Sequence, residues 1–204
     1  MNDAEIRKNF HLNRLRRHHA CANTLVIDEL GLKHGKSRAD IAVINGHLVG
    51  YEIKSDEDSL SRLEEQIKTY SDVFDRVTVI VGTKHAGAIR SHVPDWWGVI
   101  VAHRGPRGGV SFETASSPSV NPTVDPFSVA QLLWKNEAAE ALWHLGVEQV
   151  ILRQRREVLY EHLADLVSKA ELRRYVRECL KNRSNWRCQT RLSQCGGLSR
   201  PHAK

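Results

Sequence analysis

Apolar runs in the first half of the chain predict a β-hairpin followed by a helix and two buried strands. Mostly apolar residues occupy about 39–44 and 48–54, on either side of Asn45 and Gly46, which indicates two strands joined by a turn. Residues 58–74 repeat apolar side chains at helical spacing, with Asp58 or Ser59 as the cap. Continuous apolar runs at 77–82 and 97–102 favour strands buried on both faces.

Two further helices complete the predicted core. Residues 12–30 carry an apolar stripe that ends at Gly31, and a short helix near 84–93 stops before Pro94. The order is then α-β-β-α-β-α-β. We therefore expect an α/β fold with a mixed central sheet of about four strands and a C-terminal helical extension.

Composition changes divide the chain into four expected parts. Residues 1–105 form the core, and 106–126, rich in Pro, Ser, Thr and Gly, form a loop or linker. Residues 127–183 form a basic helical extension, which Asp125 and Pro126 begin and in which Ser168 and Glu171 have capping-box spacing. Residues 184–204 form a basic tail that we expect to be disordered.

The overall composition of the 204 residues is that of a soluble globular protein, with 41% hydrophobic and 26% charged residues. No apolar run approaches the ~20 residues of a membrane span, and no signal-peptide stretch opens the chain. The four cysteines show no close pairing, which favours reduced thiols and a cytoplasmic location.

Positive charge is concentrated in the last quarter of the chain. Residues 1–146 hold 17 basic and 18 acidic residues, whereas 147–204 hold 13 basic and 6 acidic residues. This surplus favours nucleic acid as a partner over a merely solvated tail. Arg173 and Arg177, four apart on a predicted helix, are expected to contact phosphates, as are Lys36 and Arg38 in the basic loop before the hairpin.

The charged residues of the hairpin are the strongest candidates for chemistry. Glu52 and Lys54 are two apart on one strand, so they share a face. Asp40 joins that face if a three-residue loop pairs Ile44 with Leu48, or if Gly50 forms a bulge, whereas a two-residue loop sends it to the other face. We predict the register that brings the acids together.

Two neighbouring carboxylates repel each other unless a cation offsets their charge. Mg²⁺ is bound by one or two carboxylates plus phosphates, and Lys54 can stabilise charge on a phosphate under attack. Gln66 and Tyr70 are four apart on the next helix, so they can approach Lys54 and hold phosphate oxygens. The alternative is a structural charge pair, Glu52 with Lys54 or Arg38, that only ends the strands.

The ordered set Asp40, Glu52-x-Lys54 and Gln66-x-x-x-Tyr70 resembles the PD-(D/E)XK nuclease superfamily. The Gln66-x-x-x-Tyr70 helix is similar to the RecB-like branch, and later stretches resemble small uncharacterised bacterial members. The resemblance covers about residues 25–82 and implies a restriction-endonuclease-like core. It also implies a Mg²⁺ (or Mn²⁺) ion on Asp40 and Glu52, joined by Glu29 from the first helix, with Lys54 assisting the nucleophile.

The expected function is a metal-dependent nuclease, a phosphodiesterase with DNA as the favoured substrate. Two alternatives stay open: a non-catalytic nucleic-acid-binding module, and an interaction subunit of a larger DNA repair or defence complex that docks through the C-terminal helices. A zinc site is not favoured, because Cys179, Cys188, Cys195 and His202 lack the C-x₂-C spacing. The absence of a membrane span leaves no membrane partner.

Overall fold

A single six-stranded sheet organises the part of the chain that the computed structural model describes, residues 1–183. The strands lie side by side in chain order, and β3, β4 and β5 are parallel while every other neighbouring pair is antiparallel. Their bounds are Leu25–Leu32 (β1), Ser37–Ile44 (β2), Leu48–Lys54 (β3), Arg76–Gly82 (β4), Gly98–Arg104 (β5) and Val110–Ser116 (β6). The mixed α/β class is confirmed, but the order with about four strands is wrong.

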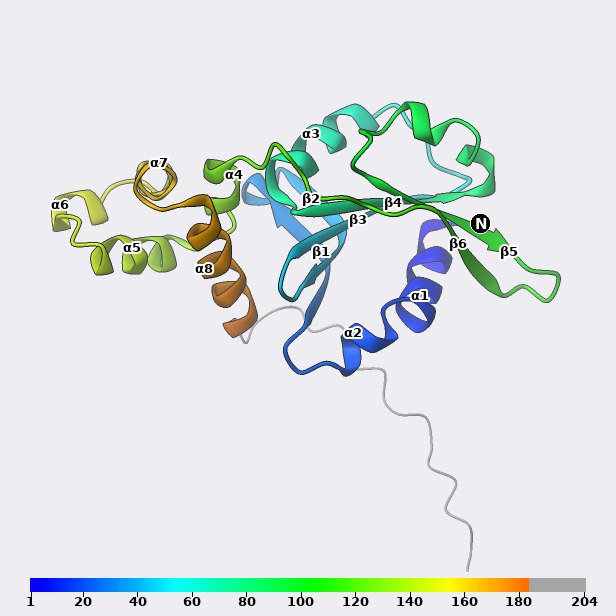
Figure 1. The fold of residues 1–204 in the computed structure, drawn as a ribbon, viewed down its shortest axis with the longest axis horizontal. Coiled ribbons are helices and arrows are strands. Elements are labelled where there is room, and N and C mark those ends of the chain that lie inside the picture. The colour runs from blue at the N-terminus through cyan, green and yellow to red at the C-terminus, as the bar shows by residue number, and fades with distance from the viewer. Residues whose placement is uncertain (184–204) are drawn as a thin grey trace, which may run out of the picture.

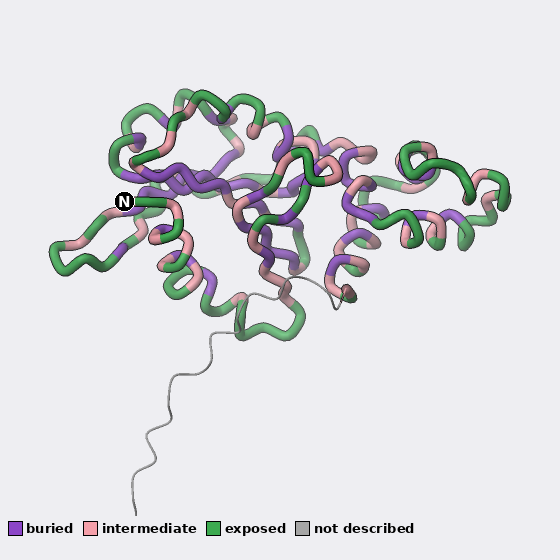
Figure 2. Tube along the Cα trace, turned by 180° about the vertical axis from the view of Figure 1, so that it is seen from behind, coloured by how far each residue is buried: buried purple, intermediate pink, exposed green. Residues whose placement is uncertain are grey.

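Helices cover both faces of this sheet (Figure 1). On one face, α1 (Asp3–Asn13), followed by α2 (Arg16–Ala20), packs Ile6 and Phe10 against the odd-numbered side chains of the hairpin, such as Ile41 and Ile53. On the other face, α3 (Leu63–Val73) packs Tyr70 and Val73 against the even-numbered ones, such as Ala42. Figure 2 shows the buried residues running along the sheet between these layers.

The C-terminal helices extend the core of the α3 face. Their bounds are Pro126–Ala130 (α4), Lys135–His144 (α5), Gln149–Leu152 (α6), Arg156–Leu166 (α7) and Lys169–Asn182 (α8). Two predicted caps are confirmed: the Asp125 carboxylate accepts from the Ser128 backbone N–H at 2.9 Å, and the Ser168 hydroxyl accepts from the Glu171 N–H at 3.3 Å.

The predicted helix over 12–30 is wrong, because its second half is β1. Ile27, Leu30 and Leu32 are buried and the strand pairs with β2. The sequence LVIDELGL fits a helical stripe as well as a strand, and only the neighbouring strand decides between them.

Three other boundaries also differ from the prediction. The expected linker contains β6, in which Val110 is buried beside β5; the surrounding Gly and Pro residues masked its short alternation. The helix near 84–93 is reduced to two 3₁₀ turns, Thr83–His85 and Ile89–Ser91. The helix α3 begins only at Leu63, because Asp58 caps the preceding loop by accepting from the Ser55 N–H at 2.7 Å.

Arg173 and Arg177 do not form the phosphate-facing pair that their spacing predicts. The guanidinium of Arg173 lies 3.3 Å from one carboxylate oxygen of the buried Asp75, and that of Arg177 lies 3.8 Å from the other. Asp75 also accepts from the Leu48 N–H at 2.8 Å. Both arginines therefore hold α8 to the sheet, because a buried carboxylate that loses its cationic partners destabilises the fold.

No helix among residues 1–183 is long and apolar enough to cross a membrane. Cys21 and Cys179 carry free thiols. The expectation of a disordered tail concerns residues 184–204, which lie outside the described part of the chain together with Cys188 and Cys195.

Gly50 of β3 lies directly beneath the ring of Phe74, the residue that follows α3, and it provides a test of this packing. A Cβ atom on Gly50 would lie 2.7 Å from the Phe74 ring, so Gly50→Ala forces the buried ring or the strand to move. We expect a loss of about 1–3 kcal/mol in the free energy of unfolding, measured by urea titration.

The matched control is Gly46→Ala in the hairpin turn, where a Cβ would meet nothing within 4 Å. It should change stability by less than about 0.5 kcal/mol. Equal effects of the two substitutions would contradict the close approach of α3 to β3.

Candidate functional site

The hairpin adopts the three-residue register that the sequence predicts. Ile44 pairs with Leu48 and Ile41 with Tyr51, and the loop is closed by the Asn45 N–H donating to the His47 carbonyl at 3.1 Å. One further step along this register places Asp40 opposite Glu52. Because strand residues two apart share a face, Asp40, Glu52 and Lys54 all lie on the side that α3 covers.

The strands β2 and β3 separate at Asp40, and its side chain fills the opening. One carboxylate oxygen, Oδ2, accepts from the backbone N–H of Ile53 at 2.7 Å. The other, Oδ1, lies 3.1 Å from the Arg7 guanidinium. The Asp40 backbone N–H donates to the Tyr70 hydroxyl at 3.1 Å. The Asp40 carboxylate therefore takes the place of a backbone hydrogen-bond acceptor between β2 and β3, and both of its oxygens are bonded.

Glu52 is 1% exposed and is held by three side chains. Lys54 Nζ lies 2.9 Å from Oε1, and the Gln66 amide donates to the same oxygen. The Tyr70 hydroxyl donates to Oε2 at 2.5 Å. The predicted approach of Gln66 and Tyr70 to Lys54 and the acids is thus present. The structure also contains the Glu52–Lys54 ion pair that the sequence allowed as a purely structural alternative.

Burial and charge repulsion change the proton affinities of this group of side chains. Burial, together with the nearby Asp40 charge, raises the pKa of Glu52 to about 7, although Lys54 and Tyr70 oppose the shift. Burial also raises the pKa of Asp40, against the hydrogen bond from Ile53 and the charge of Arg7. The pKa of Tyr70 is raised by burial and by both carboxylates. The midpoint of the Glu52 titration therefore lies near neutral pH.

Glu29 extends these acids to a third strand. The register on either side of it, Asp28 with Ile41 and Leu30 with Ala39, places Glu29 opposite Asp40. It has a left-handed φ of 55°, which interrupts the strand locally. We call Glu29, Asp40 and Glu52 the acid row. The expectation that Glu29 comes from a helix is wrong, although it does lie beside Asp40.

A hollow of about 330 Å³ borders the acid row at the β1–β2 loop and the start of α3. We call it the basic hollow. Lys36 and Arg38, the two residues of the basic loop for which the sequence predicts phosphate contacts, line this hollow together with Arg62. Gln66 lines it too, and its Oε1 is buried without a hydrogen-bond partner among the described residues. The full lining is Glu29, Gly35, Lys36, Ser37, Arg38, Arg62, Glu65 and Gln66.

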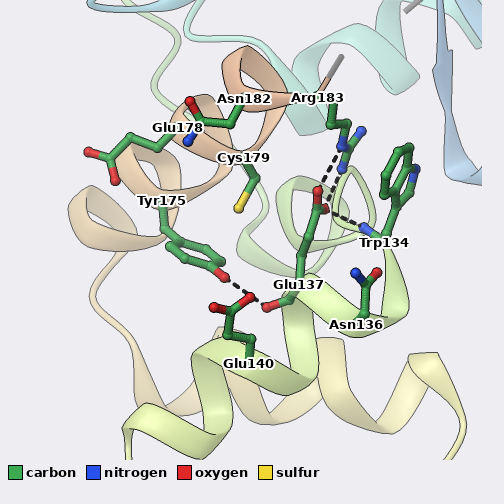
Figure 3. A pocket seen from close by; sticks show the side chains of 9 residues that line it. All are labelled: Trp134, Asn136, Glu137, Glu140, Tyr175, Glu178, Cys179, Asn182 and Arg183. Carbon is green, nitrogen blue, oxygen red and sulfur yellow. Dashed lines mark hydrogen bonds and ion pairs between the residues drawn. The ribbon is translucent and has the colours of Figure 1, made fainter. Parts of the chain in front are cut away.

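A second hollow, of about 420 Å³, lies between α5 and α8 and shares no lining residue with the first (Figure 3). The Arg183 guanidinium pairs with the Glu137 carboxylate at 2.5 Å and lies 4.4 Å from the centre of the Trp134 ring. The Tyr175 hydroxyl donates to the Glu137 carbonyl at 2.8 Å. These contacts bind α5 to α8, which is a structural role that the sequence did not indicate.

Two residues of the candidate site, Arg7 and Arg62, were not predicted from the sequence. Arg7 was missed because α1 was not expected to pack beside the hairpin, and Arg62 because the start of α3 was placed too early. Within residues 1–183, no three His, Cys, Asp or Glu side chains are gathered in a way that could hold a metal ion. A cation at the acid row would therefore depend on Asp40 and Glu52 together with water or ligand oxygens, a set that suits Mg²⁺.

Fold and site define a mixed α/β protein whose sheet carries a row of carboxylates beside a basic hollow. The chain belongs to the family described as Bacteriophage P4 protein cII, whose model matches residues 2–196. Protein cII of Enterobacteria phage P4 is 29% identical over 162 residues, covering 79% of this chain. The chain spans 60% of the length of that relative. No solved structure is significantly similar to it.

This family membership corrects the interpretation drawn from the charged motif. Membership of the PD-(D/E)XK superfamily is wrong, and with it the assignment as an endonuclease or other nuclease, because the family match covers nearly the whole chain. The motif occupies only residues 40–70 and consists of five side chains. A buried acid–lysine–tyrosine network satisfies the same spacing for structural reasons.

The raised pKa of Glu52 predicts a pH-dependent stability. A carboxyl whose pKa rises on folding, here from about 4.3 to about 7, stabilises the fold below the lower value. That contribution is lost as the pH rises through the higher one. The free energy of unfolding of the wild type should fall relative to that of Glu52→Gln between pH 5 and 8, by up to about 3 kcal/mol.

Urea titrations of both proteins at pH 5 and pH 8, in EDTA, measure this difference. Glu113→Gln is the control, because Glu113 is exposed and pairs only with His103. A difference between wild type and Glu52→Gln that is independent of pH would show that Glu52 stays ionised throughout.

Proposed function

We propose that this protein binds nucleic acid at the basic hollow, with DNA as the favoured partner. The observation that carries the proposal is the gathering of Lys36, Arg38 and Arg62 around a hollow of about 330 Å³. All three side chains are exposed, so their charges are open to a ligand. Arginine and lysine are side chains with which proteins contact the phosphate oxygens of nucleic acids.

The existing partners of these cations are easily exchanged. Arg38 lies 3.3 Å from Glu29, and the two side chains are 67% and 50% exposed. An exposed ion pair of this kind contributes little to stability. A phosphate oxygen can therefore take the place of Glu29 at the Arg38 guanidinium, since a bidentate arginine–phosphate contact is stronger than an exposed carboxylate pair.

The β1–β2 loop supports the same proposal through its backbone. Lys33, His34 and Gly35 all have left-handed φ values, of 48°, 58° and 83°. Two of them are not glycine, and such conformations cost free energy that the surrounding structure must offset. The tight turn brings Lys36 and Arg38 to the rim of the hollow directly after it.

We extend the proposal to a divalent cation, Mg²⁺ or Mn²⁺, at Asp40 and Glu52. Glu52 is buried and the Asp40 side chain is 21% exposed, and burial together with the charge of Asp40 raises the pKa of Glu52. When bound, such a cation would offset this repulsion and add phosphate oxygens of the ligand to its coordination. Gln66 and Tyr70 fix the orientation of the Glu52 carboxylate, and the cation would take oxygens that Lys54 and Arg7 now engage.

The proposal predicts that Lys36→Ala with Arg62→Ala weakens nucleic-acid binding. Each lost phosphate contact should remove about one unit from the slope of log affinity against log salt. The measurement is fluorescence anisotropy on labelled single- and double-stranded DNA and RNA, from low to moderate salt, with Mg²⁺ or with EDTA. Affinity should also fall in EDTA if the cation contributes.

The matched control is Arg153→Ala with Arg155→Ala, which removes the same charge from exposed positions after α6. It should leave a steeper salt slope than the Lys36/Arg62 pair. Equal losses in the two double variants would mean that binding follows net charge alone, and no loss in either would exclude the basic hollow as the site.

A further inference from the structure

We propose that Arg7 is the built-in cation of the acid row and that it competes there with a divalent ion. This inference rests on the cation site in the proposed function and adds the residue that sets its affinity. Arg7 lies on α1, outside the hairpin and outside the motif that the sequence analysis singled out.

The guanidinium of Arg7 contacts two members of the acid row at once. Its Nη2 lies 3.1 Å from Asp40 Oδ1 and 3.1 Å from Glu29 Oε1. Its Nη1 donates to the Asp40 carbonyl, and its Nε donates to Asp3 at 3.2 Å. One side chain therefore joins the neighbouring acids of β1 and β2, in the way that a bound cation joins carboxylates.

The charge of Arg7 is kept in spite of its burial. The side chain is 17% exposed, and burial alone would lower the pKa of the guanidinium. The charges of Asp40, Asp3 and Glu29 outweigh this effect and raise it. Arg7 is thus a permanent positive charge in a partly desolvated place, where charges act over short distances more strongly than in water.

The oxygens that Arg7 engages are those a second cation would need. Asp40 Oδ2 is occupied by the Ile53 N–H, so Oδ1 is the more available oxygen, and Arg7 takes it. Glu29 is engaged by both Arg7 and Arg38. A divalent ion at Asp40 and Glu52 therefore meets two positive charges, Arg7 and Lys54, of which only Arg7 touches Asp40.

The position of Arg7 is fixed by the packing of α1 and not by the ion pairs alone. Ile6 and Phe10, on either side of it in sequence, are 0% and 1% exposed and lie in the core beneath the sheet. Asn2 caps the helix by accepting from the Glu5 N–H at 2.9 Å. Loss of the Arg7 charge should consequently leave α1 in place and the acid row open.

The test is Mn²⁺ binding by isothermal titration calorimetry to the wild type and to Arg7→Gln. Removing one charge so close to the site should raise the affinity for Mn²⁺ by about tenfold or more. Arg7→Lys, which keeps the charge, should stay near the wild type. Arg104→Gln is the matched control, because Arg104 also pairs with α1, through Glu5, but does not touch the acid row.

A second variant tests whether the increased affinity for Mn²⁺ arises at the acid row. Arg7→Gln combined with Asp40→Asn should lose the increased affinity. Thermal unfolding gives an independent readout: Arg7→Gln should melt lower than the wild type in EDTA and gain more from added Mn²⁺.

The outcomes separate this inference from the proposed function. Mn²⁺ binding of equal affinity in the wild type and Arg7→Gln overturns the role of Arg7 and leaves the cation site standing. Binding by Arg7→Gln alone supports the role of Arg7 in its strongest form. If neither protein binds Mn²⁺, and Arg7→Gln shows no added stabilisation by it, the cation site and the inference both fail, while the basic hollow is still tested by nucleic-acid binding.

Discussion

The burial of Glu52 is the constraint on which the centre of this structure depends. A carboxylate that is 1% exposed is costly unless its oxygens are bonded and its charge is offset. Lys54, Gln66 and Tyr70 supply the bonds, and two of these three residues come from α3. The helix is therefore locked to β3 by polar contacts as well as by its apolar side chains, and Tyr70 reaches on to the Asp40 backbone. One buried acid thus joins the hairpin and the crossover helix.

The sheet opens beside this buried acid, at Asp40 and Glu29. The ladder between β2 and β3 runs regularly up to Ile41 and Tyr51. Beyond that point the Ile53 N–H bonds to the Asp40 side chain. Between β1 and β2 the left-handed Glu29 interrupts the pairing beside the same residue. Backbone groups released by this opening are satisfied by side chains, as buried polar groups must be. At this opening Arg7 reaches both Asp40 and Glu29.

The sequence carried enough information for the local geometry of the hairpin but not for its surroundings. The shared face of Glu52 and Lys54 follows from the two-residue period of a strand. The period left the register of Asp40 open between a two-residue loop, a three-residue loop and a bulge at Gly50. The choice of an arrangement that brings the acids together is confirmed by the pairing of Ile44 with Leu48. The position of β1, the presence of β6 and the approach of Arg7 depend on contacts between segments far apart in the chain. Local patterns do not contain these contacts, because a short apolar run such as LVIDELGL fits a helix and a strand equally well.

Function is still further from the local pattern, and the two arginines of α8 show why. Their spacing and the surplus charge of the last quarter pointed to phosphate contacts, yet both engage the buried Asp75. Charge counted along a sequence does not distinguish a cation that faces a ligand from one that neutralises an acid inside the fold.

The same distinction applies to the cations at the candidate site. Arg7 and Lys54 already offset the charge of two carboxylates of the acid row. The exposed cations Lys36, Arg38 and Arg62 differ from all of these. Within residues 1–183, Arg38 alone of the three has a carboxylate partner at an ion-pair distance, and that partner, Glu29, is itself half exposed. Free positive charge beside a hollow, and not the total of it, is what a polyanionic ligand can use.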